Sequence, residues 1–279
     1  MKEKLFFLQF LLFLTLPKVV NGQNDPLYAQ LQYADSLFGE GKFYDAFIEA
    51  ERLAFFDTLK LHAYTADMLR GKSLKETGQF DRARMFFEDA SLIANNRELK
   101  FEAGEEILKT LILQRRFTKF DDLITRLKPV FPEKGKEFAY WSGWRHLFAG
   151  EWEDAKEKFE KAGASNYLIA LCDSADEMSY SLTLGMLMSA ILPGAGQVYA
   201  GEYVNPVITL AWVAFGSWLV TDAIKAQRYF DAFIEGNYVL LRFYRGNLSY
   251  TYDLVTRKNK EIKNEILRFL QKNYKGPKP

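Results

Sequence analysis

The feature that most constrains the fold of this chain is a short pattern that recurs at a nearly constant interval. Three stretches, EGKFYDAFIEAERL, TGQFDRARMFFEDA and AGEWEDAKEKFEKA, share a glycine, an aromatic residue, an alanine and then apolar residues at helical spacing. A weaker copy, RRFTKFDDLITRL, lies between the second and the third. The four aligned positions, Ala46, Ala83, Phe120 and Ala155, are separated by 37, 37 and 35 residues. A period of this length predicts helical hairpins that stack and bury a shared core.

The pattern resembles the tetratricopeptide repeat (TPR), a family in which each unit is a helix, a tight turn and a second helix. Small residues, Gly71 and Gly143, occupy the position where the two helices of a unit cross, and Phe87 and Phe159 take the matching position of the second helix. The resemblance covers about residues 27–165. It implies a solenoid of about four helical hairpins, and the predicted fold class is all-α, with an apolar helical hairpin and C-terminal helices after the solenoid. An irregular all-α domain is the alternative.

The TPR resemblance also implies a concave groove that binds a protein or peptide partner. The family's groove positions fall here on Met68, Lys72, Lys75, Lys109, Tyr140 and Trp144. Tyr140 and Trp144 are one helical turn apart, and large aromatic residues are good anchors for a peptide. The alternative is that these two residues pack against the following helices. The paired lysine and asparagine residues with which some family members bind a peptide carboxylate are missing, so a site for a peptide C-terminus is not indicated.

A glycine-rich segment, ILPGAGQVYAGEYVNP (191–206), lies where two stretches without formal charge meet at Glu202. The stretch before Glu202 has 24 residues and the stretch after it has 19. The pattern predicts a helix over Met178–Leu192, which Pro193 and Gly194 end, and a second helix capped by Asn205. The second stretch, VITLAWVAFGSWLVT, is apolar on all sides, which predicts burial in a protein core or in lipid. A phosphate-binding loop is excluded, because Glu202 and Tyr203 stand where that motif needs lysine and serine or threonine.

The turn is similar to that of small bacterial membrane domains, which pair two apolar helices around the motif L-P-G-x-G-Q-x-Y-x-G. The matching residues are Leu192, Pro193, Gly194, Gly196, Gln197, Tyr199 and Gly201. The resemblance implies membrane association and no particular reaction. Three arrangements stay open: a shallow or re-entrant hairpin, a hairpin that spans the bilayer, and a hairpin buried in a second soluble helical domain.

The sequence at the two ends of the chain predicts an N-terminal targeting signal and a basic C-terminal tail. Lys2 and Lys4 precede a mainly apolar run of 12 residues, which is typical of a cleaved signal peptide and predicts export to the periplasm or cell envelope. The predicted organisation is a signal peptide (1–22), a TPR-like solenoid (23–175), an apolar hairpin (176–222) and a helical tail (223–279) with turns at Gly236–Asn237 and Gly246–Asn247. From Asp222 onward there are 12 Lys and Arg against 6 Asp and Glu. The net charge of the whole chain is only +1, so a nucleic-acid partner is not predicted.

The sequence carries no recognisable motif for catalysis, a cofactor or a metal. His62 and His146 lie in separate repeats, and the single cysteine, Cys172, is expected to be a buried apolar residue. The predicted function is a non-enzymatic protein–protein interaction scaffold, exported and membrane-associated in the cell envelope. The alternatives are a soluble periplasmic binding module, with the apolar hairpin buried under the tail helices, and an unrecognised enzyme that uses Gln197 and Tyr199.

Overall fold

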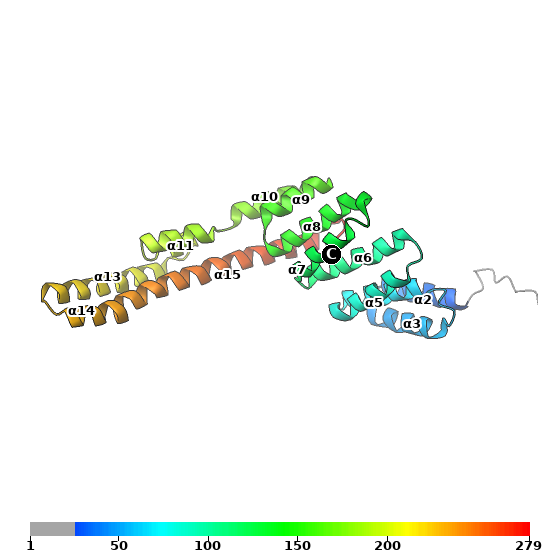
Figure 1. Cartoon of the computed structure of the whole chain (residues 1–279), viewed down its shortest axis with the longest axis horizontal. Coiled ribbons are helices and arrows are strands. Elements are labelled where there is room, and N and C mark those ends of the chain that lie inside the picture. Colours follow the sequence, from blue (N-terminus) through cyan, green and yellow to red (C-terminus); the bar gives the residue numbers. More distant parts are fainter. Residues whose placement is uncertain (1–25) are drawn as a thin grey trace, which may run out of the picture. The chain divides into compact units, whose positions relative to one another are not determined.

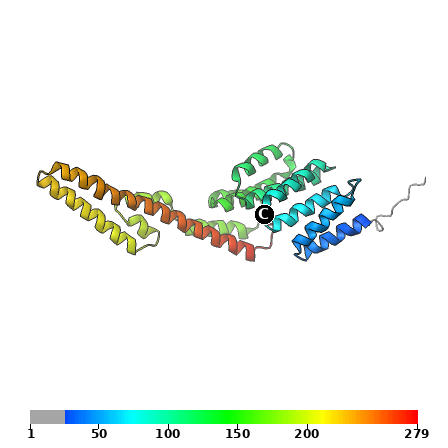
Figure 2. The same ribbon diagram turned by 90° about the horizontal axis from the view of Figure 1, so that it is seen from below.

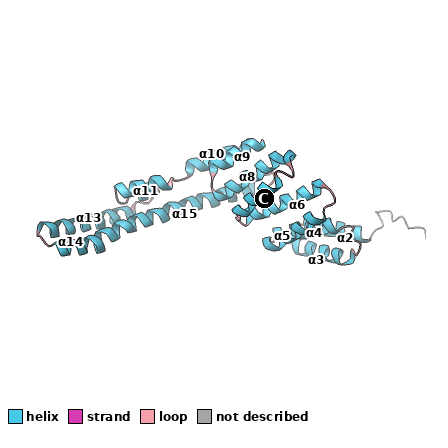
Figure 3. Ribbon diagram, in the orientation of Figure 1, coloured by secondary structure: helices cyan, strands magenta, loops and turns pink. Residues whose placement is uncertain are grey.

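The computed structural model describes residues 26–279, and the predicted signal peptide lies outside this range. Every regular element in the described range is helical (Figure 3). The first helices pair in chain order: α2 (Pro26–Gly39) with α3 (Phe43–Phe56), α4 (Ala63–Glu76) with α5 (Phe80–Ile93), α6 (Arg97–Leu113) with α7 (Phe117–Leu127), and α8 (Gly135–Ala149) with α9 (Trp152–Ala162). A short 3₁₀ turn, η2 (Pro132–Lys134), precedes α8, and α10 (Asn166–Met178) packs on α9. The predicted all-α fold with about four helical hairpins is confirmed.

The periodic positions of the sequence are core positions of these hairpins. Ala46, Ala83, Phe120 and Ala155 are all fully buried. A Cβ atom on Gly71 would lie 2.5 Å from the Phe87 ring, so the two helices of this hairpin come close at a residue without a side chain. Gly143 and Phe159 repeat this arrangement at 2.6 Å in the fourth hairpin. The pattern in the sequence therefore marks the helix crossings, where only small residues let two backbones approach.

The chain divides into two compact units, one that runs to Glu133 and one that spans Lys134–Lys278. In the first unit, α3 packs against α4 and α5 against α6, so consecutive hairpins share one core. The second unit contains the fourth hairpin together with the C-terminal helices. This division differs from the predicted boundary at residue 175, because the C-terminal part of the last helix contacts α10 and so ties the fourth hairpin to the rest of the second unit.

The C-terminal half is built on one long helix. Its elements are α11 (Leu182–Ile191), α12 (Ala195–Tyr199), α13 (Val204–Lys225), α14 (Tyr229–Glu235), the π-helical turn η3 (Gly236–Leu240) and α15 (Leu241–Asn273). Figures 1 and 2 show α13 beside the first part of α15, and α11 beside its middle. The two apolar helices of the predicted hairpin, α11 and α13, thus each pack against α15. We call α13, α14, η3 and the first part of α15 (residues 204–250) the apolar arm.

Four local predictions in this half are wrong. The chain breaks between α10 and α11, where the Ser181 side chain accepts a hydrogen bond from Leu184 N at 3.3 Å and so starts a new helix. Asn205 lies inside α13 and donates to the Tyr250 hydroxyl at 2.7 Å instead of capping the helix. Neither predicted turn of the tail forms. The helix continues through Gly236–Asn237 as η3, and α15 continues through Gly246–Asn247, where Asn247 has buried partners on α11 and at its C-terminal end. Asn205 and Asn247 have partners in distant parts of the chain, which the local sequence does not show.

Candidate functional site

The three lysines predicted to line the groove are paired with carboxylates of α6. Lys75 Nζ lies 2.7 Å from Glu106 Oε2, and Lys109 Nζ lies 2.8 Å from the other oxygen of the same carboxylate. Lys72 makes a longer contact, 3.3 Å, with Glu102. The fourth predicted groove residue of the first unit, Met68, is buried. The lysines are therefore held by internal ion pairs, which fix the positions of α4 and α6 relative to each other.

Burial and charge act in opposite directions on the Glu106 cluster. Burial alone would raise the pKa of Glu106, but the positive charges of Lys75 and Lys109 outweigh it and hold this pKa below its usual value. Burial likewise acts to lower the pKa of Lys109, and the carboxylates of Glu106 and Glu105 outweigh it, so the pKa is raised. Glu106 and Lys109 are therefore charged at neutral pH.

Tyr140 and Trp144 lie together on α8, as predicted, and the chain itself covers them. Trp144 is almost fully buried, and the ring centroids of Tyr140, Phe159 and Tyr274 lie within 6.5 Å of its own ring centroid. Tyr140 is half-buried, and burial together with a hydrogen bond to Tyr274 raises its pKa. Large aromatic residues are present at the predicted groove positions of the fourth hairpin, and the C-terminal segment lies over them.

The residues of the turn motif form one compact structure around two glycines. Leu192 and Pro193 end α11, and Gly194 follows in the left-handed region with φ of 91°, which favours glycine. A Cβ atom on Gly194 would also lie 2.9 Å from the backbone of Pro206. At the other end of the short helix α12, Gly201 has φ of 80°. These glycines let the backbone reverse between α11 and α13.

The closest approach in the turn is between α12 and α11. A Cβ atom on Gly196 would lie 1.9 Å from the carbonyl oxygen of Gly185. Gly196 N donates a hydrogen bond to Ser189 Oγ at 3.1 Å, so the contact is polar as well as close. Only a residue without a side chain fits at position 196.

A buried polar network joins the motif to α15. The Asn247 side-chain oxygen accepts hydrogen bonds from Gly194 N at 2.9 Å and from Gln197 Nε2 at 3.1 Å, while its nitrogen donates to the Ser189 carbonyl at 2.9 Å. The hydroxyl groups of Ser189 and Thr251 are 2.7 Å apart. All these side chains are buried, and Gln197 Oε1 has no hydrogen-bond partner among residues 26–279. Such a network is stronger in apolar surroundings than in water, and it specifies one register between the helices.

Two further contacts complete this structure, which we call the turn clasp. The Tyr199 hydroxyl accepts a hydrogen bond from Ser181 N at 2.8 Å, and the Tyr199 ring packs edge-on against Tyr180. Asn259 of α15 exchanges hydrogen bonds with both backbone groups of Tyr180. The structure therefore brings together all seven predicted motif residues. It adds Asn247, Thr251 and Asn259, for which the only sequence signal is polar side chains on one stripe of an otherwise aromatic and apolar helix face.

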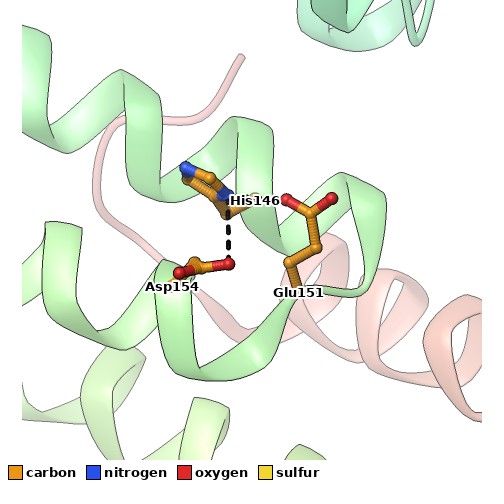
Figure 4. A group of neighbouring side chains, drawn as sticks. All are labelled: His146, Glu151 and Asp154. Carbon is orange, nitrogen blue, oxygen red and sulfur yellow. Dashed lines mark hydrogen bonds and ion pairs between the residues drawn. The ribbon is translucent and has the colours of Figure 1, made fainter.

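One group of side chains in the fourth hairpin has the composition of a metal site. His146, Glu151 and Asp154 converge where α8 ends and α9 begins (Figure 4). His146 Nδ1 lies 2.6 Å from Glu151 Oε2 and 4.0 Å from Asp154 Oδ2. Arg145 Nη1 contacts the same Glu151 oxygen at 2.5 Å and lies 3.3 Å from His146 Nδ1. A guanidinium already stands where a cation would be held, so this group is better described as an ion-pair network that fixes the helix turn.

Cys172 lies beside a cavity of about 260 Å³ between α9 and α10. The cavity is lined mainly by acidic residues, and Lys156 pairs there with Asp173 at 2.7 Å. Burial, and to a smaller extent the charge of Asp173, raises the pKa of the Cys172 thiol to about 12. The thiol is therefore protonated at neutral pH and is a poor nucleophile, in keeping with the predicted structural role.

Comparison with known proteins adds no family assignment: no protein-family model matches the chain, and no curated protein shows significant similarity to it. Among the described residues, α13 is the one helix that is long and apolar enough to cross a membrane. The features that stand out are thus the turn clasp, the apolar arm and the covered aromatic residues of the fourth hairpin.

Proposed function

We propose that this chain is a non-enzymatic protein–protein interaction scaffold, exported to the cell envelope and held at a membrane by its apolar arm. The TPR-like hairpins would bind a protein or peptide partner, and the turn clasp would fix the arm to the rest of the second unit. The observation that carries this proposal is the exposed apolar surface of α13. The sequence motif of the turn and the signal-like N-terminus support the same location.

The surface of α13 is apolar where a soluble helix would be polar. Only 17% of the residues in its most apolar window are buried. Val207 is 68% exposed and Trp218 is 60% exposed. Other large apolar residues of α13 with substantial exposure are Val204, Ile208, Leu210, Trp212, Phe215 and Ile224. Monomeric soluble proteins rarely expose contiguous apolar patches larger than a few hundred Å², so this helix needs a covering that residues 26–279 do not supply.

Polar groups bound the apolar surface of α13 at both ends. At the tip of the arm, Arg228 pairs with Asp222 and Asp231 at 3.0 Å each. At the other end, Glu202 and the exposed Tyr203 precede the helix. A charge-free stretch between an aromatic residue and a charged cluster is typical of a segment that enters lipid and leaves it again.

The arginines of α15 favour a shallow position for the arm. A Cβ atom on Gly216 would lie 3.0 Å from the Cα atom of Leu240, which places the middle of α13 level with the start of α15. Arg242 and Arg245 follow within about one turn, and both are exposed. A charged residue at the bilayer centre costs about 2.5–3.5 kcal/mol or more, whereas at the surface it can contact anionic headgroups. We therefore propose that α13 lies in the apolar layer near the surface, with α15 toward the headgroups.

The depth of α13 can be measured by tryptophan quenching with brominated lipids. Trp212 and Trp218 are both exposed on α13. For a shallow arm, bromine placed near the headgroup should quench their fluorescence more strongly than bromine placed near the end of the acyl chain. The opposite order would indicate a spanning helix and would overturn the shallow arrangement.

The membrane proposal itself predicts a large effect of charges on the exposed face of α13. Val207 and Trp218 are 11 positions apart, which is close to three helical turns, so they share a face. In full-length protein, Val207→Glu with Trp218→Glu should reduce the partition into vesicles of phosphatidylethanolamine and phosphatidylglycerol about a hundredfold or more. The reason is that each of the two apolar side chains contributes about 1.5–3 kcal/mol when lipid covers it. Flotation of the vesicles through a density gradient measures the bound fraction.

The matched control is Phe55→Glu with Leu92→Glu. These two residues of the first unit are even more exposed than those on α13, so the change in charge and apolar area is similar. The control should float with the vesicles as the unaltered protein does. Equal loss in both variants, or unaltered protein that stays in the aqueous fraction, would contradict the proposed membrane role.

A further inference from the structure

The face of α8 that carries Tyr140 and Trp144 holds an extended peptide segment, and that segment is part of the chain itself, residues 274–277. Helix α15 ends at Asn273, and the residues that follow are not helical. The Tyr140 hydroxyl lies 3.0 Å from the Tyr274 hydroxyl and donates a hydrogen bond to the Pro277 carbonyl at 2.5 Å. One tyrosine of α8 thus contacts both ends of the segment Tyr274–Pro277.

The ring of Tyr274 occupies a slot between aromatic side chains. It stacks on Tyr167 with an interplanar angle of 10° and a centroid separation of 5.9 Å. On another side, the centroid of the Trp144 ring is also 5.9 Å away. We call Tyr140, Trp144 and Tyr167 the aromatic slot; they come from the beginning of α10 and two turns of α8. Stacked and edge-on aromatic pairs each contribute about 0.5–1.5 kcal/mol beyond the area they bury, so the slot selects a ring.

The backbone after Tyr274 limits which sequences fit. A Cβ atom on Gly276 would lie 2.2 Å from the Tyr274 hydroxyl, so the segment folds over the ring at a residue without a side chain. Pro277 follows and offers its carbonyl to Tyr140. In contrast, Lys275 and Lys278 are exposed, and Lys278 Nζ donates only to the Gln271 carbonyl. The contacts therefore fit a peptide with the sequence Tyr-x-Gly-Pro, in which the second position is not specified.

The attachment of this segment is weak enough to be exchanged. It consists of one ring in a slot and two hydrogen bonds to Tyr140, each hydrogen bond contributing about 1 kcal/mol net. The segment remains in place because it is tethered to α15, and a short tether gives an effective concentration in the millimolar range. A second peptide that presents the same groups must compete with this tethered copy.

We propose that the aromatic slot is a binding site for an extended Tyr-x-Gly-Pro segment of a partner protein, and that residues Tyr274–Lys278 occupy it in cis until such a partner displaces them. This inference rests on the proposed scaffold function and specifies the partner and its regulation. The bound segment of this chain shows which groups a partner needs, because the contacts would be the same if the tyrosine and the glycine–proline pair belonged to another protein.

The test is binding of a fluorescent peptide, KNYKGPKP (residues 272–279), to the full chain in detergent, followed by fluorescence anisotropy. In Tyr274→Ala, the tethered ring is lost and the slot is open, so the apparent Kd should be at least about tenfold lower than for the unaltered chain. The same peptide with its tyrosine replaced by alanine should not bind. Tyr252→Ala, which removes an exposed tyrosine further back on α15, should bind as weakly as the unaltered chain.

A second variant shows whether the peptide uses the slot. In the Tyr274→Ala background, Tyr140→Ala should abolish the gained binding, while circular dichroism verifies that the helices persist. An unchanged Kd in Tyr274→Ala, or binding that survives the loss of Tyr140, would overturn the inference. Vesicle flotation of the same variants separates the two proposals: peptide binding without flotation contradicts the membrane role, and flotation without peptide binding contradicts only the slot.

Discussion

Gly196→Ala should open the turn clasp, because its new methyl group has no space. The Cβ atom would lie 1.9 Å from a backbone oxygen of α11 and 2.6 Å from Ser189 Oγ, and backbone atoms cannot move aside as a flexible side chain can. Overpacking of a tight contact costs about 1–3 kcal/mol and sometimes more, and we expect the upper end here. Since about 1.4 kcal/mol changes an equilibrium tenfold, amide hydrogen exchange in α11 and α12 should be roughly a hundredfold faster.

Gly246→Ala is the matched control for this experiment. Gly246 lies on α15, one position before Asn247, and a Cβ atom there would contact nothing within 4 Å. Alanine in a helix is favoured over glycine by about 0.5–1 kcal/mol, so exchange should be unchanged or slower. Similar acceleration in both variants would show that the close approach of α12 to α11 does not stabilise the second unit.

Glu106→Gln should strongly destabilise the first unit. The side chains of Lys75, Glu106 and Lys109 are 10%, 9% and 15% exposed, so the substitution leaves two largely buried ammonium groups without their shared carboxylate. Removing one partner from a buried ion pair costs about 3–5 kcal/mol. Urea unfolding, followed by circular dichroism, measures the loss. The exposed Glu40 pairs with Lys42 on the surface, and Glu40→Gln should leave the midpoint unchanged.

The same ion pairs predict how the loss depends on pH. The pKa of Glu106 is lowered in the folded chain, so its contribution is present above the ordinary carboxyl pKa of about 4.3 and is lost as the pH falls through the lower, folded value. The pKa of Lys109 is raised, so its contribution is present below about 10.4 and is lost as the pH rises through the higher, folded value. The difference in stability between Glu106→Gln and the unaltered chain should be constant at neutral pH and shrink below about pH 4. A difference that does not shrink at all as the pH falls below about 4 would contradict the assignment of the effect to charge.

The sequence was sufficient for the helical hairpins because their core positions repeat locally. Ala46, Ala83 and Ala155 recur with the same neighbours, and each is fully buried. The period also located Gly71 and Gly143 at helix crossings, where the contacts with Phe87 and Phe159 leave no room for a side chain. These features depend on residues within one repeat, so a pattern of spacing is enough to find them.

The sequence also identified the residues of the turn motif, but not what they contact. Asn247 lies 53 residues after Gly194 and accepts its hydrogen bond. The sequence suggested a turn at Asn247, since asparagine after glycine is a common turn signal. Burial reversed that preference, because a buried asparagine with three hydrogen bonds stabilises the helical conformation more than it would stabilise a turn.

The sequence by itself thus determined that this chain is helical, where its hairpins cross, and that one segment lacks the charges of a soluble surface. Only the tertiary structure decided that the groove lysines are paired with Glu106, that the apolar helices pack against α15, and that Tyr274 covers Tyr140 and Trp144. The physical reason is one of range. Helix periodicity and glycine positions are set by neighbouring residues, whereas an ion pair, a buried amide and a docked ring each depend on a partner that the fold brings from a distant part of the chain.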